Sequence, residues 1–580
     1  MVQPREEYKD IGTYTIARYK QDLILKLDMN ENTLGCSPHV IKTLKSLPVD
    51  VYSKYPAYGE IEEKIASFFN LSTEKVLITN GGDAGINAVY LTYVNEGDEV
   101  IYAVPSYVMY KLDAQRVRAR IVQVPYEKKW VYPAEKVIEA ITEKTKLIVI
   151  SSPANPTGDI VCEGDIIRII EAAPNSMVLL DEAYWRFVDR ENKSLYYLIN
   201  KYNNLTIMHT FSKDYGLAGI RIGYLLSCQE NIAHIGKSMD PFSVNNIAVE
   251  AGLASMEDPE FVDNYVKHVR ESKEYFTEAI KEIADEVYES QANFVCFYVG
   301  SKYEWYYAKL LKNRIKIRRY PHNPLLKGYL RVTLGTVDQM KTVLNHFKDY
   351  DAIIFDIDGV FVNESLSYRK AIQLTYEFFS GKTITQEEIQ EYKNQEGFID
   401  DWILTRHLLS IIGINLSLEE VTEKFQEFYW KDGKGLIAEE KLLLNPEIIK
   451  LLNRQYKMAV FTGRPREEAE YILKKEGIID CFDIIVSSND VPEGKGKPDS
   501  YGINVICDKL KSKNIIYFGD MPDDIRAAEK AGIDSAGILP PQDKSEKLKD
   551  LLLSLGAIEV YDNLEKAIEC VFGEIEKVKV

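Results

Sequence analysis

The segment His209-Thr210-Phe211-Ser212-Lys213 decides the fold class of the first part of this 580-residue chain. It overlaps the end of an apolar run at 206–210, and Arg221 follows the lysine by eight residues. Similar apolar runs alternate with helical patterns around it, at 75–79, 99–103, 147–151 and 177–180. This alternation predicts an α/β fold with a mixed, mainly parallel sheet that is covered by helices.

The composition limits the classes of partner. The chain has 71 basic and 89 acidic residues and a formal charge of -18, which disfavours binding to nucleic acid or to an anionic membrane. The seven cysteines are scattered and form no C-x-x-C pair, so they indicate neither a disulfide framework nor a zinc site. The charged N-terminus and the lack of an apolar run of about 18 residues lead us to expect a cytoplasmic protein.

A second signature begins near residue 350. Ala352-Ile353-Ile354-Phe355 predicts a fresh buried strand, and Asp356-Ile357-Asp358-Gly359 follows it directly. Because side chains alternate along a strand, the two aspartates are expected on the same edge of its exit loop. We therefore place a boundary between 1–349 and 350–580.

The second part has a helical insert. Helical patterns without strands fill 367–444, with expected helices at 368–379, 399–412 and 418–430. Strand signals resume at 458–462, 484–487 and 515–518. The sequence therefore predicts a core from 350–366 and 445–580, with 367–444 as an all-helical cap.

Further motifs surround Lys213 in a fixed order. They are Asn30-Glu31-Asn32-Thr33-Leu34-Gly35, Tyr55-Pro56, Asn80-Gly81-Gly82-Asp83-Ala84, Pro105-Ser106-Tyr107, Asn155-Pro156-Thr157-Gly158 and Asp181-Glu182-Ala183-Tyr184. With these motifs, residues 10–349 resemble the histidinol-phosphate aminotransferases of pyridoxal-phosphate (PLP) fold type I. The resemblance implies a large domain at about 50–240 and a small domain from 1–35 and 241–349. Thr33, Cys36 and Ala84 depart from the family pattern.

The resemblance also implies roles for these residues. Lys213 would hold the cofactor aldehyde and act as general base, while Asp181 would pair with the pyridine nitrogen. Asn155 and Tyr184 would contact the phenolic oxygen, and Tyr107 would stack on the ring. The phosphate group would be held by Gly82, Asp83, Thr210, Ser212, Arg221 and, from a neighbouring subunit, Tyr55. The protein would therefore be a homodimer.

Arginines indicate the substrate of the first site. Arg331 resembles the arginine that this fold uses for a substrate anion, and Arg318 resembles a second one that the histidinol-phosphate branch adds. Two guanidinium groups suit a phosphorylated keto or amino compound, and also glutamate or 2-oxoglutarate. Tyr14 and Asn30 are expected to complete the substrate site. Arg319 is an alternative to Arg318.

The second part resembles the haloacid-dehalogenase-type phosphatases of subfamily I over about 350–560. The resemblance makes Asp356 the nucleophile and Asp358 the general acid and base, with Thr462 and Lys497 at the phosphate. It implies a Mg²⁺ site from Asp356, Asp358, Asp520 and Asp524, with Asp523 as an alternative to Asp524. Residues 396–402 are either the loop that selects the substrate or a helix start capped by acids.

The two signatures together predict a bifunctional enzyme of histidine biosynthesis. It would transaminate imidazole-acetol phosphate with glutamate and then hydrolyse a phosphomonoester, which we expect to be histidinol phosphate. The alternatives are a threonine-phosphate decarboxylase or an aromatic aminotransferase as the first part. The second part could instead act on an unrelated phosphate or serve as a regulatory module.

Overall fold

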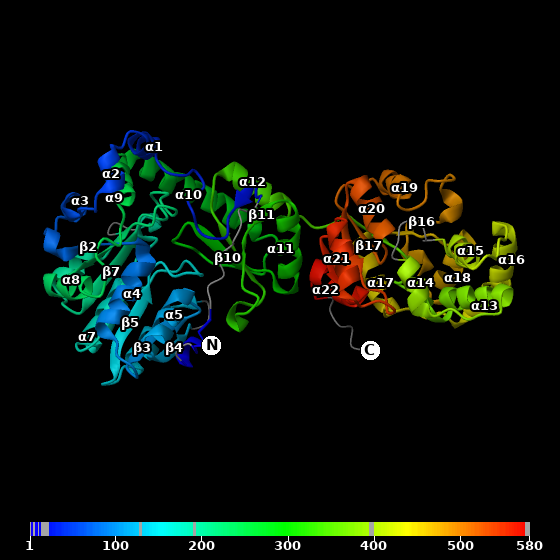
Figure 1. Ribbon diagram of the computed structural model, residues 1–580, viewed down its shortest axis with the longest axis horizontal. Coiled ribbons are helices and arrows are strands. Elements are labelled where there is room, and N and C mark those ends of the chain that lie inside the picture. Colours follow the sequence, from blue (N-terminus) through cyan, green and yellow to red (C-terminus); the bar gives the residue numbers. More distant parts are fainter. Residues whose placement is uncertain are drawn as a thin grey trace. The chain divides into compact units, whose positions relative to one another are not determined.

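The structure is a computed structural model that describes residues 2–3, 6–9, 11–12, 22–126, 130–189, 193–393 and 400–574 (Figure 1). The chain forms two compact units, one from Met1–Gly300 with Asn313–His346 and the other from Ser301–Lys312 with Phe347–Val580. Tyr14 and residues 396–399 of the expected selectivity loop lie outside the described residues.

A seven-stranded sheet forms the centre of the first unit. Its strands, in spatial order, are β2 (Val76–Thr79), β8 (Gly223–Ser227), β7 (Leu205–Thr210), β6 (Met177–Asp181), β5 (Thr145–Ser151), β3 (Glu99–Val104) and β4 (Arg120–Pro125). Strand β8 runs antiparallel to both of its neighbours, and the other pairs are parallel. The mixed, mainly parallel sheet is therefore confirmed.

Alternating side chains cover this sheet on both faces. In β5, Leu147 and Val149 belong to one buried cluster, while Ile148 and Ile150 belong to another. The first cluster includes residues of α4 (Gly81–Tyr93), α5 (Val108–Arg116) and α8 (Gln229–Gly236); the second includes residues of α3 (Gly59–Phe69), α7 (Glu163–Ala172) and α9 (Asn246–Met256). A sheet buried on both faces leaves its strand ends for a site.

A smaller antiparallel sheet completes the first unit. Its order is β12 (Arg318–Arg319), β13 (Tyr329–Thr333), β10 (Phe294–Tyr298) and β9 (Glu286–Val287), and β1 (Leu25–Lys26) pairs separately with β11 (Ile315–Lys316). Helices α10 (Pro259–Ile280) and α12 (Val337–Asn345) pack against each other. The remaining helices are α1 (Pro38–Lys45), α2 (Val49–Ser53) and α6 (Ala134–Glu139).

The second unit contains a six-stranded parallel sheet. Its order is β16 (Ile484–Val486), β15 (Lys457–Phe461), β14 (Ala352–Phe355), β17 (Ile515–Gly519), β18 (Asp534–Ile538) and β19 (Glu559–Tyr561). The helices of this core are α17 (Pro446–Asn453), α18 (Arg466–Lys475), α19 (Tyr501–Leu510), α20 (Pro522–Ala531), α21 (Glu546–Ser554) and α22 (Leu564–Phe572). The predicted strand over 352–355 is confirmed, and it lies in the middle of the sheet.

The predicted helical insert follows β14 and has its own buried core. Its helices are α13 (Tyr368–Ser380), α14 (Gln386–Lys393), α15 (Asp401–Ile411) and α16 (Leu418–Tyr429), followed by the 3-10 turn η10 (Leu436–Glu439). Helix α14 was not predicted. It carries mostly glutamate and glutamine, so its apolar stripe is too thin to be recognised from periodicity.

Helix α11 (Tyr303–Lys312) belongs to the second unit, although its sequence lies within 1–349. Lys309 forms an ion pair with Asp534 at 3.0 Å, and the ring of Trp305 meets that of Tyr350 edge-on at 6.3 Å. The chain therefore enters the second unit at residue 301, leaves it at 313 and returns at 347.

Candidate active sites

Lys213 lies in the turn that follows β7. Its amine donates a hydrogen bond to the carbonyl oxygen of Met29 at 2.9 Å. Burial, followed by the positive charge of Arg331, lowers the pKa of Lys213 to about 8. About a tenth of the amine is therefore neutral at pH 7, and a neutral amine can attack a carbonyl or accept a proton.

Asp181 ends β6, the strand beside β7, and its carboxylate is buried. It accepts hydrogen bonds from the hydroxyl of Tyr110 at 2.5 Å and from the backbone N–H of Ala183 at 3.0 Å. Burial raises the pKa of Asp181 to about 6, which the hydrogen bond from Tyr110 partly offsets. Nearby, the hydroxyl of Tyr184 accepts a hydrogen bond from Asn30 Nδ2 at 2.9 Å.

An anion cradle lies at the N-terminus of α4. The helix begins with Gly81 and Gly82, and a Cβ added to Gly81 would lie 2.4 Å from Arg221 Nη2. Glycine at this position leaves room for the arginine, and its φ of +78° also favours glycine. The N–H groups of the first helical turn and the helix dipole favour an anion here. Arg221 pairs with Asp83 at 3.2 Å. Tyr107, predicted to stack on the cofactor ring, donates a hydrogen bond from its hydroxyl to Asp83 at 2.9 Å. Thr210 and Ser212, predicted to bind the phosphate group, have hydroxyls that lie 2.9 Å apart.

Arg318 and Arg331 are direct partners across β12 and β13. Like charges opposite each other on a sheet repel, so this pair indicates a site for an anion. Arg331 is 5% exposed. It donates hydrogen bonds to Asn155 Oδ1 at 2.5 Å and to the carbonyl oxygen of Asp28 at 2.7 Å. Its buried Nε has no hydrogen-bond partner. Arg319 pairs with Leu330, and strand alternation places it on the other face of the sheet from Arg318.

Tyr55 does not join this group within one chain. Its side chain is 79% exposed, and its ring stacks on that of Phe242 at 4.5 Å.

The second site gathers three aspartates at the carboxyl edge of the parallel sheet. Carboxylate oxygens of Asp356, Asp520 and Asp524 all lie within 4.8 Å of one another. Lys497 Nζ reaches Asp356 at 2.9 Å and Asp524 at 2.6 Å. Asp520 Oδ1 is buried and has no hydrogen-bond partner, while burial and the Asp524 and Asp356 charges raise the pKa of Asp520 well above its usual value.

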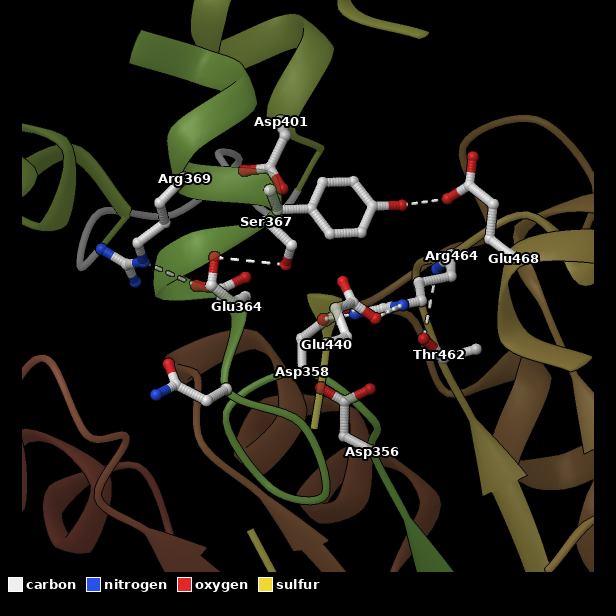
Figure 2. A network of polar contacts seen from close by, with 12 residues as sticks. Asp356, Asp358, Glu364, Ser367, Arg369, Asp401, Glu440, Thr462, Arg464 and Glu468 are labelled. Atoms are coloured by element: carbon white, nitrogen blue, oxygen red, sulfur yellow. Dashed lines mark hydrogen bonds and ion pairs between the residues drawn. The ribbon is translucent and has the colours of Figure 1, made fainter. Parts of the chain in front are cut away.

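Asp358 has a different partner. Its side chain is not in the three-aspartate cluster of the described residues, because it faces the guanidinium group of Arg464 at 2.5–3.1 Å (Figure 2). Thr462 lies beside this pair, and its hydroxyl accepts the backbone N–H of Arg464 at 3.1 Å. Asp523 is also outside the cluster, 3.7 Å from Arg526, so the geometry favours Asp524 over Asp523.

A cavity of about 60 Å³ lies over these groups, and its lining includes Asp356, Asp358, Lys497 and Asp520. Asp400, Asp401 and Trp402, the described part of the expected selectivity loop, also line it. Asp400 caps α15 by accepting the N–H groups of Trp402 and Ile403 at 2.8 and 3.0 Å. The segment therefore both caps a helix and faces the cavity.

Comparison with known proteins identifies the two parts. Residues 23–347 match the family "Aminotransferase class I and II", which is more than half of the chain. The chain belongs to this aminotransferase family. Residues 353–538 match the family "Haloacid dehalogenase-like hydrolase". The aminotransferase thus carries a second enzyme domain, and the predicted fold class is confirmed for both parts.

Similar proteins match the aminotransferase part. A histidinol-phosphate aminotransferase 2 of Hydrogenovibrio crunogenus is 34% identical over 54% of this chain and 84% of its own length. The histidinol-phosphate aminotransferase of Symbiobacterium thermophilum is 34% identical over 56% and 90%. The solved structure of the Sinorhizobium meliloti enzyme with pyridoxal-5'-phosphate has a TM-score of 0.52 and 22% identity, and covers 56% of this chain and 89% of its own.

The residues present fit the cofactors that the two families imply. For PLP, the aminotransferase offers an amine with a lowered pKa, a buried carboxylate and a phosphate cradle closed by Arg221. For Mg²⁺, the hydrolase domain offers three clustered carboxylates, one of which has an oxygen without a partner. Oxygen ligands of this kind suit a hard divalent cation.

Sequence reasoning assigned no role to three residues that contact the sites. Tyr110 donates to Asp181, Arg464 donates to Asp358, and Glu440 accepts from Arg464. Arg464 stands two residues after Thr462, so its position could have drawn attention, whereas nothing in the sequence marks Glu440. Among all the residues that the structure describes, in both units, no helix combines the length and apolar character needed to cross a membrane.

Proposed function

We propose that the chain performs two consecutive steps of histidine biosynthesis. The aminotransferase domain would transfer the amino group of glutamate to imidazole-acetol phosphate, and the hydrolase domain would remove phosphate from the resulting histidinol phosphate. The observation that carries the first step is the pairing of Arg318 with Arg331 on neighbouring strands, which suits a phosphate dianion. The names of the similar aminotransferases support the same substrate.

Each residue of the proposed transamination site would have its own role. When bound at Lys213, PLP would supply an aldehyde that accepts an amino group and a ring that takes up negative charge. The Lys213 amine would move the proton at the substrate α-carbon. Asp181 would keep the ring nitrogen protonated, and Asn155 and Tyr184 would orient the ring oxygen. Arg331 would bind the substrate anion, with Arg318 beside it.

In the proposed phosphatase site, one aspartate would be the nucleophile and another the general acid and base. Asp356 would attack phosphorus, so that a bond from its carboxylate oxygen to phosphorus forms as the bond to the alcohol oxygen breaks. Asp358 would give its proton to that alcohol. In the second half, Asp358 would take a proton from water as the water oxygen attacks phosphorus and the aspartyl bond breaks. Thr462 and Lys497 would bind the phosphoryl oxygens, and the three clustered aspartates would hold Mg²⁺.

We also propose a homodimer through the aminotransferase domain. Tyr55 at 79% exposure, Val49 at 75% and Tyr52 at 60% present apolar surface that a second copy would cover. In a two-fold contact Tyr55 would reach the phosphate cradle of the partner. The cytoplasmic location stays a prediction from the sequence.

The test follows both products of one incubation. The full-length protein, loaded with PLP, is given imidazole-acetol phosphate and glutamate, with Mg²⁺ or with a chelator. We expect histidinol phosphate in the chelator arm, and histidinol with inorganic phosphate in the Mg²⁺ arm. Absence of any transaminated product would reject the first step, and intact histidinol phosphate in the Mg²⁺ arm would reject the second. Carbon dioxide release from threonine phosphate would instead favour the decarboxylase alternative.

A further inference from the structure

Arg464 is buried between Asp358, in the hydrolase core, and the helical insert. The residue is 2% exposed, and it lies in the loop after β15. Nε donates to both carboxylate oxygens of Asp358, at 3.1 and 3.0 Å, and Nη2 donates to Oδ1 at 2.5 Å. The fork therefore fixes the orientation of the Asp358 carboxylate, which a single point charge would not do.

The other side of the same guanidinium group contacts the insert (Figure 2). Nη1 donates to Glu440 Oε2 at 2.8 Å and to the hydroxyl of Tyr429 at 3.0 Å, and Nη2 donates to Glu440 Oε1 at 3.1 Å. Tyr429 ends α16, and Glu440 directly follows η10. The ring of Tyr368, at the start of α13, lies 4.9 Å from the guanidinium carbon.

These contacts occupy every donor of Arg464. A guanidinium group has five N–H donors, and here they meet Asp358, Glu440 and Tyr429. None is left for a phosphoryl oxygen, although the residue lines the cavity. The charge of Arg464 is likewise shared by two carboxylates, so it adds little net attraction for a phosphate.

We propose that Arg464 is a positioning residue: it holds Asp358 where that carboxyl group exchanges a proton with the leaving oxygen, and it links this acid to the helical insert through Glu440 and Tyr429. The inference rests on the proposed phosphatase function. It assigns Arg464 to one step, the transfer of a proton from Asp358 to the alcohol as the phosphorus–oxygen bond breaks. A substrate whose leaving group departs without a proton should therefore be indifferent to Arg464.

The test compares two substrates of the full-length, Mg²⁺-loaded protein. Histidinol phosphate releases an alkoxide that needs a proton, whereas p-nitrophenyl phosphate releases a stable phenolate. Arg464→Lys keeps the positive charge but loses the fork. Since general acid catalysis contributes about 10²- to 10⁴-fold, we expect kcat/KM for histidinol phosphate to fall at least tenfold, and that for p-nitrophenyl phosphate by less than about threefold. Glu440→Gln, which loosens only the anchor on the insert, should give a smaller loss with the same selectivity.

Arg466→Lys is the matched control. Arg466 stands two residues away, is half-exposed and pairs with Asp490 at 2.6 Å, so its variant should leave both substrates unchanged. If Arg464→Lys does not fold, the double variant Arg464→Met with Glu440→Gln removes both charges together and should show the same selectivity. Equal losses on both substrates, or no loss on either, would overturn the positioning role. A wild-type protein inactive on both substrates would overturn the phosphatase function itself, and this inference with it.

Discussion

Lys213 owes its chemistry to its surroundings. Its pKa falls to about 8 because burial and the positive charge of Arg331 outweigh the opposite effects of Asp83 and Glu31. Only the neutral amine attacks an aldehyde. We therefore expect the rate at which the apoenzyme takes up PLP, followed by stopped-flow absorbance, to rise about tenfold per pH unit below pH 8 and to level off above it. A rate that keeps rising to about pH 10 would indicate an amine with an ordinary pKa.

Single site residues could be predicted from the sequence where they lie at the carboxyl end of a predicted strand. Asp356, Lys497, Asp520 and Asp524 come together because each follows or faces the carboxyl edge of a parallel strand. The partner of Asp358 could not be predicted in the same way. Arg464 is 106 residues away from it and Glu440 comes from the end of the insert, so their meeting depends on how the insert packs on the core.

The register of β12 with β13 distinguishes the adjacent residues Arg318 and Arg319 by the residue that each one faces. Arg318 faces Arg331, whereas Arg319 faces Leu330. A charge-assisted hydrogen bond contributes about 1.5–3 kcal/mol, so Arg318→Ala should lower kcat/KM for the phosphorylated keto substrate by roughly 10- to 100-fold. Arg319→Ala is the matched control and should change it by less than about threefold.

An unphosphorylated aromatic acceptor completes this comparison. It offers no dianion, so Arg318→Ala should affect its kcat/KM much less. Equal losses for both acceptors would point to a general aromatic aminotransferase. A loss confined to Arg319→Ala would transfer the role to that residue and contradict the register argument.

At the level of elements, the sequence predicts strands better than their directions. The apolar runs at 75–79, 99–103, 147–151, 177–180 and 206–210 correspond to β2, β3, β5, β6 and β7. Strand β8 runs antiparallel between β2 and β7, and its direction depends on pairing that no local pattern records. Helix α12 begins at Val337, where Thr336 and Gln339 form a capping box.

Across the whole molecule, the residues proposed to catalyse each reaction lie within one compact unit: Lys213 in the first, and Asp356 and Asp358 in the second. Lys213→Ala should therefore abolish the absorbance of covalently held PLP and transamination, and leave phosphatase activity near normal. Asp356→Asn should do the reverse, because an amide is a poor nucleophile. Assaying both activities on each variant checks this. Loss of both activities in one folded variant would falsify the separation of the sites.

The placement of α11 predicts which unit a mutation in it destabilises. Trp305 is 1% exposed and packs near Tyr350, so Trp305→Ala should cost about 3–5 kcal/mol. We expect the unfolding transition of the second unit to fall by roughly 6–20 °C in calorimetry. Added PLP raises the transition of the first unit and so identifies it. Phe276→Ala, in α10, is the control and should move the first transition. The opposite pattern would return α11 to the aminotransferase unit.

Because α11 lies so early in the chain, it leaves the ribosome before the residues that it packs against. Lys312 bonds to Glu529, which is 217 residues further on. At about 5–20 residues per second, roughly 10–40 s pass before that partner is made. During this time the second unit, to which Trp305, Tyr306 and Leu310 belong, is still incomplete. The nascent chain therefore carries α11 before all of its second-unit neighbours have been made, and we expect chaperones to bind this helix during that interval.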